Sequence, residues 1–533
     1  MTEPSPLARE AAINAWNTYP VKATSQVSYR SAGRVIVIGN ATALEACGHW
    51  TTPGQVALLC SDSGAGGLPD GAIAAPRESI RVSGYLGAFD VELVEPGRPP
   101  RHLEADILVD FSREALFPAE IPPPGYLHRD IDTDKPEEVE QEVSDLVGEF
   151  EKPKFFHYDA SKCAHSVNGV TVCSRCIDAC PAEAIEDAGD AIAVIPFLCQ
   201  GGGSCATVCP SGAIQYAYPG LSDSGNRLRV MLEAYRQAGG SRPVILFHAE
   251  SRPVEELVSR SERLLPAPVE ELASVGMELC LSALAYGAER VILLDDDEVP
   301  ALSRQSLRRQ LEWLQGLLAA MGMTGSPVIM QGESVALPLE APAVAVEAAV
   351  QDMPGDKRKA FFQAIDHLVS RIGQGDAVID LPPGAPFGSV VIDENKCTLC
   401  LACIGACPGR ALQDGSNREA PEVFFIESHC IQCGACTQTC PEQAMTLVPR
   451  LVLDRESRNR SRVLHRDEPF GCIQCGKPFA PTSAIEKMVS RLEDHPMFRK
   501  PGALDRLKMC EDCRVVDIVQ DRDAMNGNFD PSA

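Results

Sequence analysis

Cysteine carries most of the chemistry that this 533-residue sequence can perform, because all but three of its 22 cysteines fall into spaced groups. The spacing C-x2-C-x2-C-x3-C-P occurs twice in succession. Such a double run is typical of a pair of [4Fe–4S] clusters, since three thiolates on one loop bind three irons and the fourth iron takes the last cysteine of the other run. The predicted ligand sets are Cys397, Cys400, Cys403 and Cys440 for one cluster and Cys430, Cys433, Cys436 and Cys407 for the other.

A modified copy of this double run lies earlier in the chain. Its first half has a loop of nine residues after the first cysteine, and its second half has Gly202 where the middle cysteine belongs. If the last cysteine of each half again binds the cluster of the other half, one [4Fe–4S] cluster is complete and a second cluster has three thiolates. We expect that second cluster to be [3Fe–4S] or a [4Fe–4S] with a labile iron. The alternative is a decayed module with one cluster or none. The predicted sets are Cys163, Cys173, Cys176 and Cys209, and then Cys199, Cys205 and Cys180.

Two further C-x2-C pairs stand near the C-terminus, Cys472 with Cys475 and Cys510 with Cys513. Two such pairs are typical of a structural Zn²⁺ site with four thiolates. Neither pair has a C-x3-C-P partner, which favours zinc over the alternative of a fifth iron–sulfur cluster. The remaining cysteines, Cys47, Cys60 and Cys280, are expected to be buried and inert.

The elements around these groups predict a multidomain α/β and α+β protein, in which two dicluster ferredoxin-like modules are inserted among α/β domains. Buried strands are expected at residues 34–39, 105–110, 244–247 and 291–294. The expected parts are an N-terminal arm (1–32), an α/β domain (33–125), a linker with an acidic helix (126–154), the modified module (155–219), a second α/β domain (223–330), a linker with a helix (331–388), the dicluster module (389–449) and a small metal-binding tail (450–533).

Composition limits the partners of the chain. With 48 basic and 74 acidic residues, its net charge of −26 argues against nucleic acid and anionic membranes as partners, and favours proteins with basic patches. No apolar run approaches the roughly 18 residues that span a bilayer. The N-terminus has no secretory pattern, so we expect a cytoplasmic protein with reduced thiols.

Other catalytic signatures are missing. The turn after the first strand, Gly39 to Leu44, lacks the G-x-G-x-x-G fingerprint of dinucleotide-binding folds. There is no phosphate-binding P-loop, and the ten histidines form no triad with serine and aspartate. The sequence therefore predicts electron carriers and assigns no catalytic residue.

The cysteine runs of residues 389–449 resemble the bacterial dicluster ferredoxin family, which implies a compact pair of βαβ units around two clusters. Residues 276–294 resemble the delta subunit of methyl-viologen-reducing hydrogenase, and residues 82–91 resemble the heterodisulfide reductase flavoprotein that is fused to ferredoxin modules. The whole arrangement is similar to proteobacterial 4Fe–4S proteins encoded beside molybdenum formate dehydrogenases. That resemblance implies such an enzyme as a partner.

We therefore expect an iron–sulfur protein that relays electrons between a redox enzyme, such as a molybdenum formate dehydrogenase, and another carrier. Two alternatives remain open. One is an oxidoreductase subunit with a flavin or other active site in the N-terminal α/β domain. The other is an accessory factor for the maturation of a molybdenum enzyme.

Overall fold

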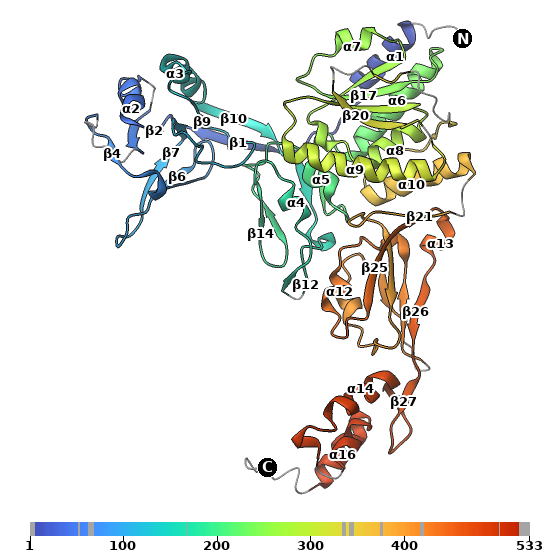
Figure 1. The fold of residues 1–533 in the computed structure, drawn as a ribbon. Coiled ribbons are helices and arrows are strands. Elements are labelled where there is room, and N and C mark those ends of the chain that lie inside the picture. The colour runs from blue at the N-terminus through green and yellow to red at the C-terminus, as the bar shows by residue number, and fades with distance from the viewer. Residues whose placement is uncertain are drawn as a thin grey trace.

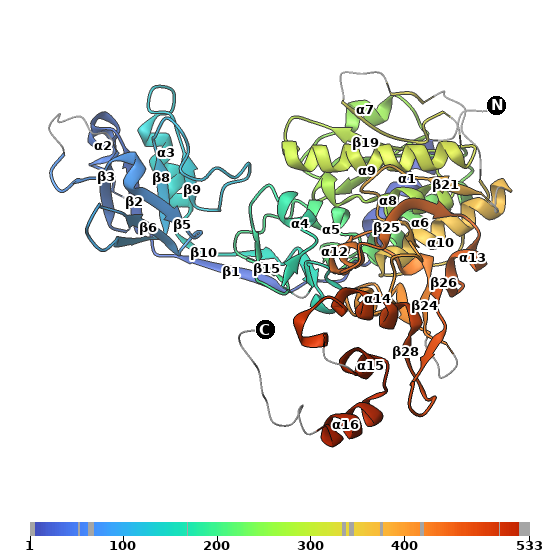
Figure 2. The same ribbon diagram turned by 60° about the horizontal axis from the view of Figure 1, so that its bottom comes forward.

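The computed structural model describes residues 6–51, 54–61, 69–167, 169–323, 325–332, 337–339, 346–373, 377–415, 420–499 and 502–521. The chain forms two α/β domains, two small cysteine-rich modules and a C-terminal tail, which Figures 1 and 2 show spread out rather than wrapped around one core. The first module lies between the two α/β domains, and the second module lies between the larger domain and the tail. No helix in the described part of the chain is long and apolar enough to cross a membrane.

The N-terminal domain is built on a parallel five-stranded sheet in the order β4-β3-β2-β8-β9. Its strands are β2 (Val35–Gly39), β3 (Val56–Cys60), β4 (Ile73–Ala74), β8 (Ile107–Asp110) and β9 (Tyr126–His128), with helix α2 (Ala41–Cys47) after β2. An antiparallel sheet of β5 (Ile80–Ser83), β6 (Phe89–Leu93) and β7 (Arg101–Ala105) covers one face. Helix α3 (Pro136–Asp145) buries Val139 and Val143 on the other face.

These contacts correct two expected boundaries. Strand β9 and helix α3 belong to the N-terminal domain, so this domain continues past residue 125 and residues 126–145 are not a linker. The expected N-terminal arm is also structured. Helix α1 (Pro6–Thr18) buries Ala8, Ala12 and Trp16 in the core of the second α/β domain. Strand β1 (Gln26–Ser31) pairs with β10 (Gly148–Pro153), and this ribbon joins the two halves of the molecule (Figure 1).

The second α/β domain has a parallel sheet in the order β18-β17-β19-β20. Its strands are β17 (Val244–Ala249), β18 (Leu264–Val269), β19 (Arg290–Asp295) and β20 (Val328–Gly332). One core joins a face of this sheet to α6 (Leu221–Gln237), α8 (Met277–Ala285), α9 (Ala301–Ala320) and α10 (Lys357–Ile372), while α7 (Glu255–Ser259) packs on the other face. Helix α10 was expected in a linker, but it is part of this core and packs along α8.

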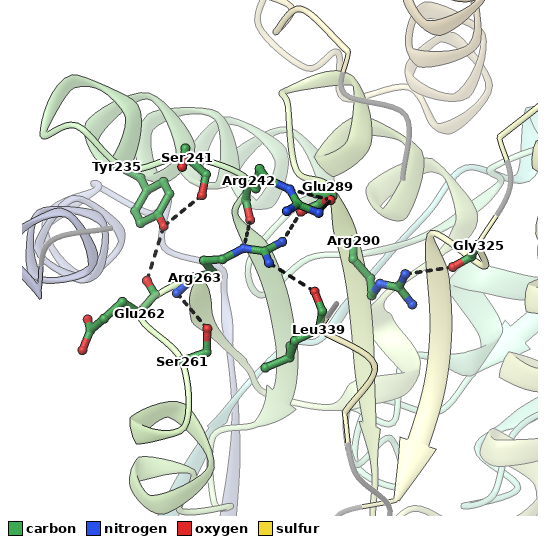
Figure 3. Close-up of polar contacts among 10 residues, drawn as sticks. All are labelled: Tyr235, Ser241, Arg242, Ser261, Glu262, Arg263, Glu289, Arg290, Gly325 and Leu339. Carbon is green, nitrogen blue, oxygen red and sulfur yellow. Dashed lines mark hydrogen bonds and ion pairs between the residues drawn. The ribbon is translucent and has the colours of Figure 1, made fainter. Parts of the chain in front are cut away.

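The amino ends of these strands are held together by a buried ion-pair network (Figure 3). The Glu289 carboxylate is 6% exposed and accepts hydrogen bonds from Arg242 Nε at 2.9 Å and from Arg263. Arg263 also donates to the Arg242 carbonyl oxygen at 2.9 Å, and Arg290 donates to the Gly325 carbonyl oxygen at 2.8 Å. Because ligands of open α/β sheets bind at the carboxyl ends of the strands, this network at the opposite end is structural.

The two cysteine-rich modules share one plan. The first pairs β11 (Phe156–Tyr158) with β16 (Ile214–Tyr216) and β14 (Ile185–Asp187) with β15 (Ile192–Val194), around α4 (Arg175–Asp178) and α5 (Ser204–Val208). The second pairs β22 (Gly388–Ile392) with β25 (Met445–Val452) and β23 (Leu412–Asp414) with β24 (Glu422–Phe425), around α11 (Ala402–Gly405) and α12 (Ala435–Thr439). The nine-residue loop inserted in the first module carries the short strands β12 (Ser166–Val167) and β13 (Val170–Thr171).

The second module is larger than expected. Strand β21 (Val378–Asp380) pairs with β25, and β26 (Arg462–Arg466) pairs with β24 after helix α13 (Arg455–Asn459). The expected boundary at residue 449 therefore falls inside the module's own strand β25. The tail that follows consists of the hairpin β27 (Pro469–Gly471) and β28 (Pro478–Pro481) and of helices α14 (Thr482–Leu492), α15 (Ala503–Leu507) and α16 (Glu511–Gln520).

Candidate metal centres

One cavity of the second module is lined by four cysteines, and these are the four expected to share a cluster. We call them group C, and they are Cys407, Cys430, Cys433 and Cys436. The rest of the lining is mostly apolar and includes Val390, Leu412, Phe425 and Leu447. Burial above all raises the pKa of the Cys436 thiol, and the charges of Cys430, Cys433 and Cys407 add to it. Four cysteine sulfurs around one mostly apolar cavity are a donor set that suits an iron–sulfur cluster.

The other four cysteines of the second module also lie near one another. We call them group D, and they are Cys397, Cys400, Cys403 and Cys440. Burial raises the pKa of Cys403 to about 12, and the charges of the other three contribute. Cys400 is exposed, whereas Cys430 and Cys436 of group C are buried. Group D is therefore the more solvent-accessible of the two groups.

Backbone amides in both modules point at cysteine sulfur. The N–H groups of Ala184, Ala411 and Ala444 donate to the Sγ atoms of Cys180, Cys407 and Cys440 at 3.4, 3.3 and 3.3 Å. Each donor follows a residue with positive φ, namely Glu183, Arg410 and Gln443, at 48, 52 and 49°. Hydrogen bonds to cluster sulfurs are a feature of protein iron–sulfur sites and help to set their potentials. The first half of the first module therefore keeps this turn geometry of the second module.

The complete set expected in the first module is also assembled. Group B consists of Cys163, Cys173, Cys176 and Cys209. Burial raises the pKa of Cys176 to about 12, followed by the charges of Cys209, Cys173 and Cys163. His165, for which the sequence predicted no role, fixes the inserted loop beside this group. Its side chain is 1% exposed, with Nδ1 2.8 Å from the Cys173 carbonyl oxygen and Nε2 3.1 Å from Asp187.

The three remaining cysteines of the first module line a separate cavity. We call them group A, and they are Cys180, Cys199 and Cys205. No fourth cysteine is among the described residues that line this cavity, whose wall includes Phe155, Tyr216 and the segment from Gly201 to Gly203. A Cβ atom on Gly202 would meet the Pro181 side chain at 3.5 Å, which is ordinary contact. A Cβ on Gly203, where φ is +78°, would lie 2.6 Å from the Ser274 backbone. Only the central glycine has room for a side chain.

The tail places its four cysteines together as expected. The Sγ atoms of Cys472, Cys475, Cys510 and Cys513 all lie within 4.8 Å of one another, and those of Cys475 and Cys510 are 3.8 Å apart. A tetrahedron with Zn–S bonds of about 2.3 Å has sulfur atoms about 3.8 Å apart. Burial raises the pKa of Cys472, but backbone N–H groups of Cys510, Cys475 and Gln474 lower it to about 6. The residues therefore fit one metal ion.

The turn after β2 is not open to a phosphate. The Asn40 side chain accepts the Ala43 N–H at 2.9 Å and so caps α2, which has only seven residues. A Cβ on Gly39 would lie 3.0 Å from Ala43 Cβ and 3.1 Å from Phe111 Cβ. This geometry gives no support to a flavin bound at that turn.

Comparison with known proteins identifies the second module. Residues 389–441 match the family model of a 4Fe–4S dicluster domain. A stretch of 151 residues is 30% identical to hydrogenase-4 component A of Escherichia coli strain K12, covering 28% of this chain and 66% of that protein. The chain thus spans just under two thirds of the length of that relative. It contains a ferredoxin-like domain of the 4Fe–4S dicluster class within a larger α/β protein.

Proposed function

We propose that this chain is an electron-transfer protein that holds four iron–sulfur clusters, at groups A to D, and a Zn²⁺ ion in its tail. Iron–sulfur clusters take up and release single electrons when bound. Groups B, C and D each provide four thiolates, whereas group A provides three. We assign [4Fe–4S] clusters to the first three groups, and a [3Fe–4S] cluster or a [4Fe–4S] cluster with one labile iron to group A.

The observation that carries this proposal is the row in which the groups lie. The charges of Cys176 and Cys209, in group B, act on Cys205 of group A, whose pKa burial raises well above its usual value. The charge of Cys403, in group D, likewise helps to raise the pKa of Cys436 in group C. Between the modules, the charge of Cys173 in group B helps to raise the pKa of Cys433 in group C. These electrostatic influences give the order A-B-C-D, which is the arrangement that we propose for the relay.

The two ends of this row differ in their surroundings. At the group A end, the Phe197 ring stacks on Tyr85 of the N-terminal domain with centroids 4.3 Å apart. Lys152 Nζ, on β10, donates to the carbonyl oxygens of Phe197 and Cys199 at 3.0 and 2.7 Å, which ties the β1–β10 ribbon to the loop of group A. At the group D end, Cys400 is exposed. We infer that a redox partner docks at the exposed group D end.

The partners in this proposal are redox proteins. The similarity to hydrogenase-4 component A supports a role beside a hydrogenase-type enzyme, and the resemblance to proteins encoded beside molybdenum formate dehydrogenases supports that enzyme as the alternative. A cytoplasmic location fits thiolates that must stay reduced to bind clusters. A purified protein that carries a flavin spectrum would favour an oxidoreductase subunit instead. Clusters that are dispensable for turnover of the partner enzyme would favour an accessory factor.

The test is anaerobic purification followed by iron and sulfide counting and redox-titrated EPR. We expect about 15 iron atoms per chain, from three [4Fe–4S] clusters and one [3Fe–4S] cluster. Cys403→Ser should remove the signal of the group D cluster, and Cys436→Ser that of the group C cluster. Cys280→Ala, in the buried helix α8, is the control and should keep full iron. Unchanged iron content and reduction kinetics in both serine variants would refute the ligand assignment.

A further inference from the structure

Two consecutive cations at the start of α10 bind the backbone of both cysteine-rich modules. Lys357 Nζ donates to the carbonyl oxygens of Ala206, Thr207 and Cys209 at 2.8, 2.5 and 3.2 Å. These residues form the end of α5 and the last cysteine of the first module's second run. Helix α10 itself belongs to the core of the second α/β domain. The lysine therefore anchors the group B loop to a rigid element.

Arg358 reaches both modules at once. Its Nη1 donates to the carbonyl oxygens of Pro210 and Pro386 at 3.3 and 2.9 Å, and its Nη2 donates to those of Ser428 and Cys430 at 2.9 and 3.0 Å. Pro210 follows Cys209 of group B, and Cys430 is in group C. One planar guanidinium thus joins a ligand loop of each group.

The surroundings hold this guanidinium in place. It lies over the rings of Phe387 and Phe362, 4.8 and 5.5 Å from their centroids. Burial lowers the pKa of Arg358 to about 10, so the side chain stays cationic at neutral pH. None of its four hydrogen-bond acceptors is a carboxylate. The positive charge is therefore directed at the carbonyl groups of the two ligand loops.

We propose that Arg358 connects the two modules of the relay. It fixes the distance between groups B and C, and its charge favours the reduced state of the clusters bound there. This inference rests on the proposed function. A reduced cluster is more negative than an oxidised one, and nearby charge is one of the factors that set cluster potentials. At an effective dielectric constant near 20, a unit charge about 10 Å away shifts such an equilibrium by on the order of tenfold.

Three variants separate charge from position. Arg358→Gln removes the charge, and Arg358→Lys keeps the charge but loses the planar fork that spans the two loops. Lys359→Gln, at an exposed side chain on the same turn, is the control. Each protein is purified anaerobically, its iron and sulfide are counted, and EPR gives the cluster potentials and the magnetic interaction between reduced neighbouring clusters.

We expect Arg358→Gln to lower the ratio of reduced to oxidised cluster at a fixed ambient potential by roughly tenfold for group B or C, about 59 mV for a one-electron couple. Arg358→Lys should keep the potentials and weaken the magnetic interaction, and Lys359→Gln should match the wild type. If Arg358→Gln cannot be isolated with full iron, the magnetic interaction measured in Arg358→Lys decides whether Arg358 positions the two groups. An unchanged magnetic interaction in Arg358→Lys would overturn the positioning role. Unchanged cluster potentials in Arg358→Gln would overturn the role of the charge. A wild-type protein without iron at groups B and C would instead overturn the proposed function.

Discussion

The side-chain amide of Gln432 donates a hydrogen bond to the sulfur of Cys430, with 3.2 Å between Nε2 and Sγ. The same nitrogen lies 2.9 Å from the Ser389 carbonyl oxygen, and the side chain is 7% exposed. Gln432 has φ of 52°, and Leu399 occupies the equivalent position of the preceding run at 49°. Leucine has no side-chain donor, so of these two positions only Gln432 donates a side-chain hydrogen bond to a cysteine.

We therefore predict that Gln432→Leu lowers the potential of the group C cluster. A hydrogen bond to a cluster sulfur stabilises the more negative state, and losing roughly 1 kcal/mol of that preference corresponds to about 40 mV for one electron. The backbone should tolerate the change because Leu399 has the same conformation. Redox-titrated EPR makes the measurement, with the exposed Gln443→Leu, also at positive φ, as the matched control. Equal potentials in wild type and Gln432→Leu would show that this bond does not tune the cluster.

The missing ligand at Gly202 gives the second prediction. Gly202→Cys should supply a fourth thiolate to group A, because a side chain fits there against Pro181. The oxidised wild-type protein should show the EPR signal of a [3Fe–4S] centre, and the variant should lose this signal and gain one iron. Gly202→Ala is the control and should keep the signal. A wild-type protein that is EPR-silent when oxidised and fully loaded with iron, and a variant without any change, would mean that an unidentified group already binds the fourth iron.

The third prediction concerns the tail. Cys510 is the N-cap residue of α16 and belongs to the group of four cysteines there, so Cys510→Ser should release zinc and unfold the segment that the metal holds together. Structural zinc sites supply much of the folding free energy of small domains. We expect faster proteolysis of the tail with an unchanged iron spectrum, measured by limited digestion and metal analysis. His495→Ala should retain zinc. A loss of about four irons from Cys510→Ser would identify the site as a fifth cluster.

The contact between the tail and the second module gives the fourth prediction. Glu442, two residues after Cys440, forms ion pairs with Lys487 at 2.6 Å and Arg491 at 2.7 Å, both on α14. These cations lower the pKa of Glu442 below its usual value, the hydrogen bond from Lys487 first. The carboxylate is therefore fully charged at neutral pH, and the contact should weaken as pH falls through that lowered pKa.

Glu442→Gln should accordingly speed hydrogen exchange in α14 at neutral pH, and added salt should have a similar effect on the wild type. Zinc content should not change, because the four cysteines are untouched. Glu486→Gln, at an exposed neighbour on the same helix, is the matched control. Identical exchange in all three proteins would show that the ion pairs do not hold the tail on the module.

Local spacing explains how much of this protein was predictable. Cysteines with two or three residues between them lie on one loop whatever the rest of the chain does, so the groups could be proposed from sequence. The structure brings the cysteines of each predicted set near one another, and their role as cluster ligands stays a prediction. Helix α1 was missed because its buried face consists of Ala8, Ala12 and Trp16, which give a weak hydrophobic pattern. The boundary at residue 449 was misplaced because β25 runs on to pair with β21.

The sequence by itself determined the class of chemistry that we propose, since thiolate spacing indicates the kind of metal centre and sets the geometry of the ligand loops. Only the tertiary structure decided how the two modules face each other. The contact between them depends on Arg358, which is far from Cys209 in the chain and lies on a helix that the sequence placed in a linker. Long-range packing of α10 against α8 fixes that helix, and such packing has no signature in local spacing. A pattern of cysteines therefore predicts clusters, but the path between them is a property of the folded chain.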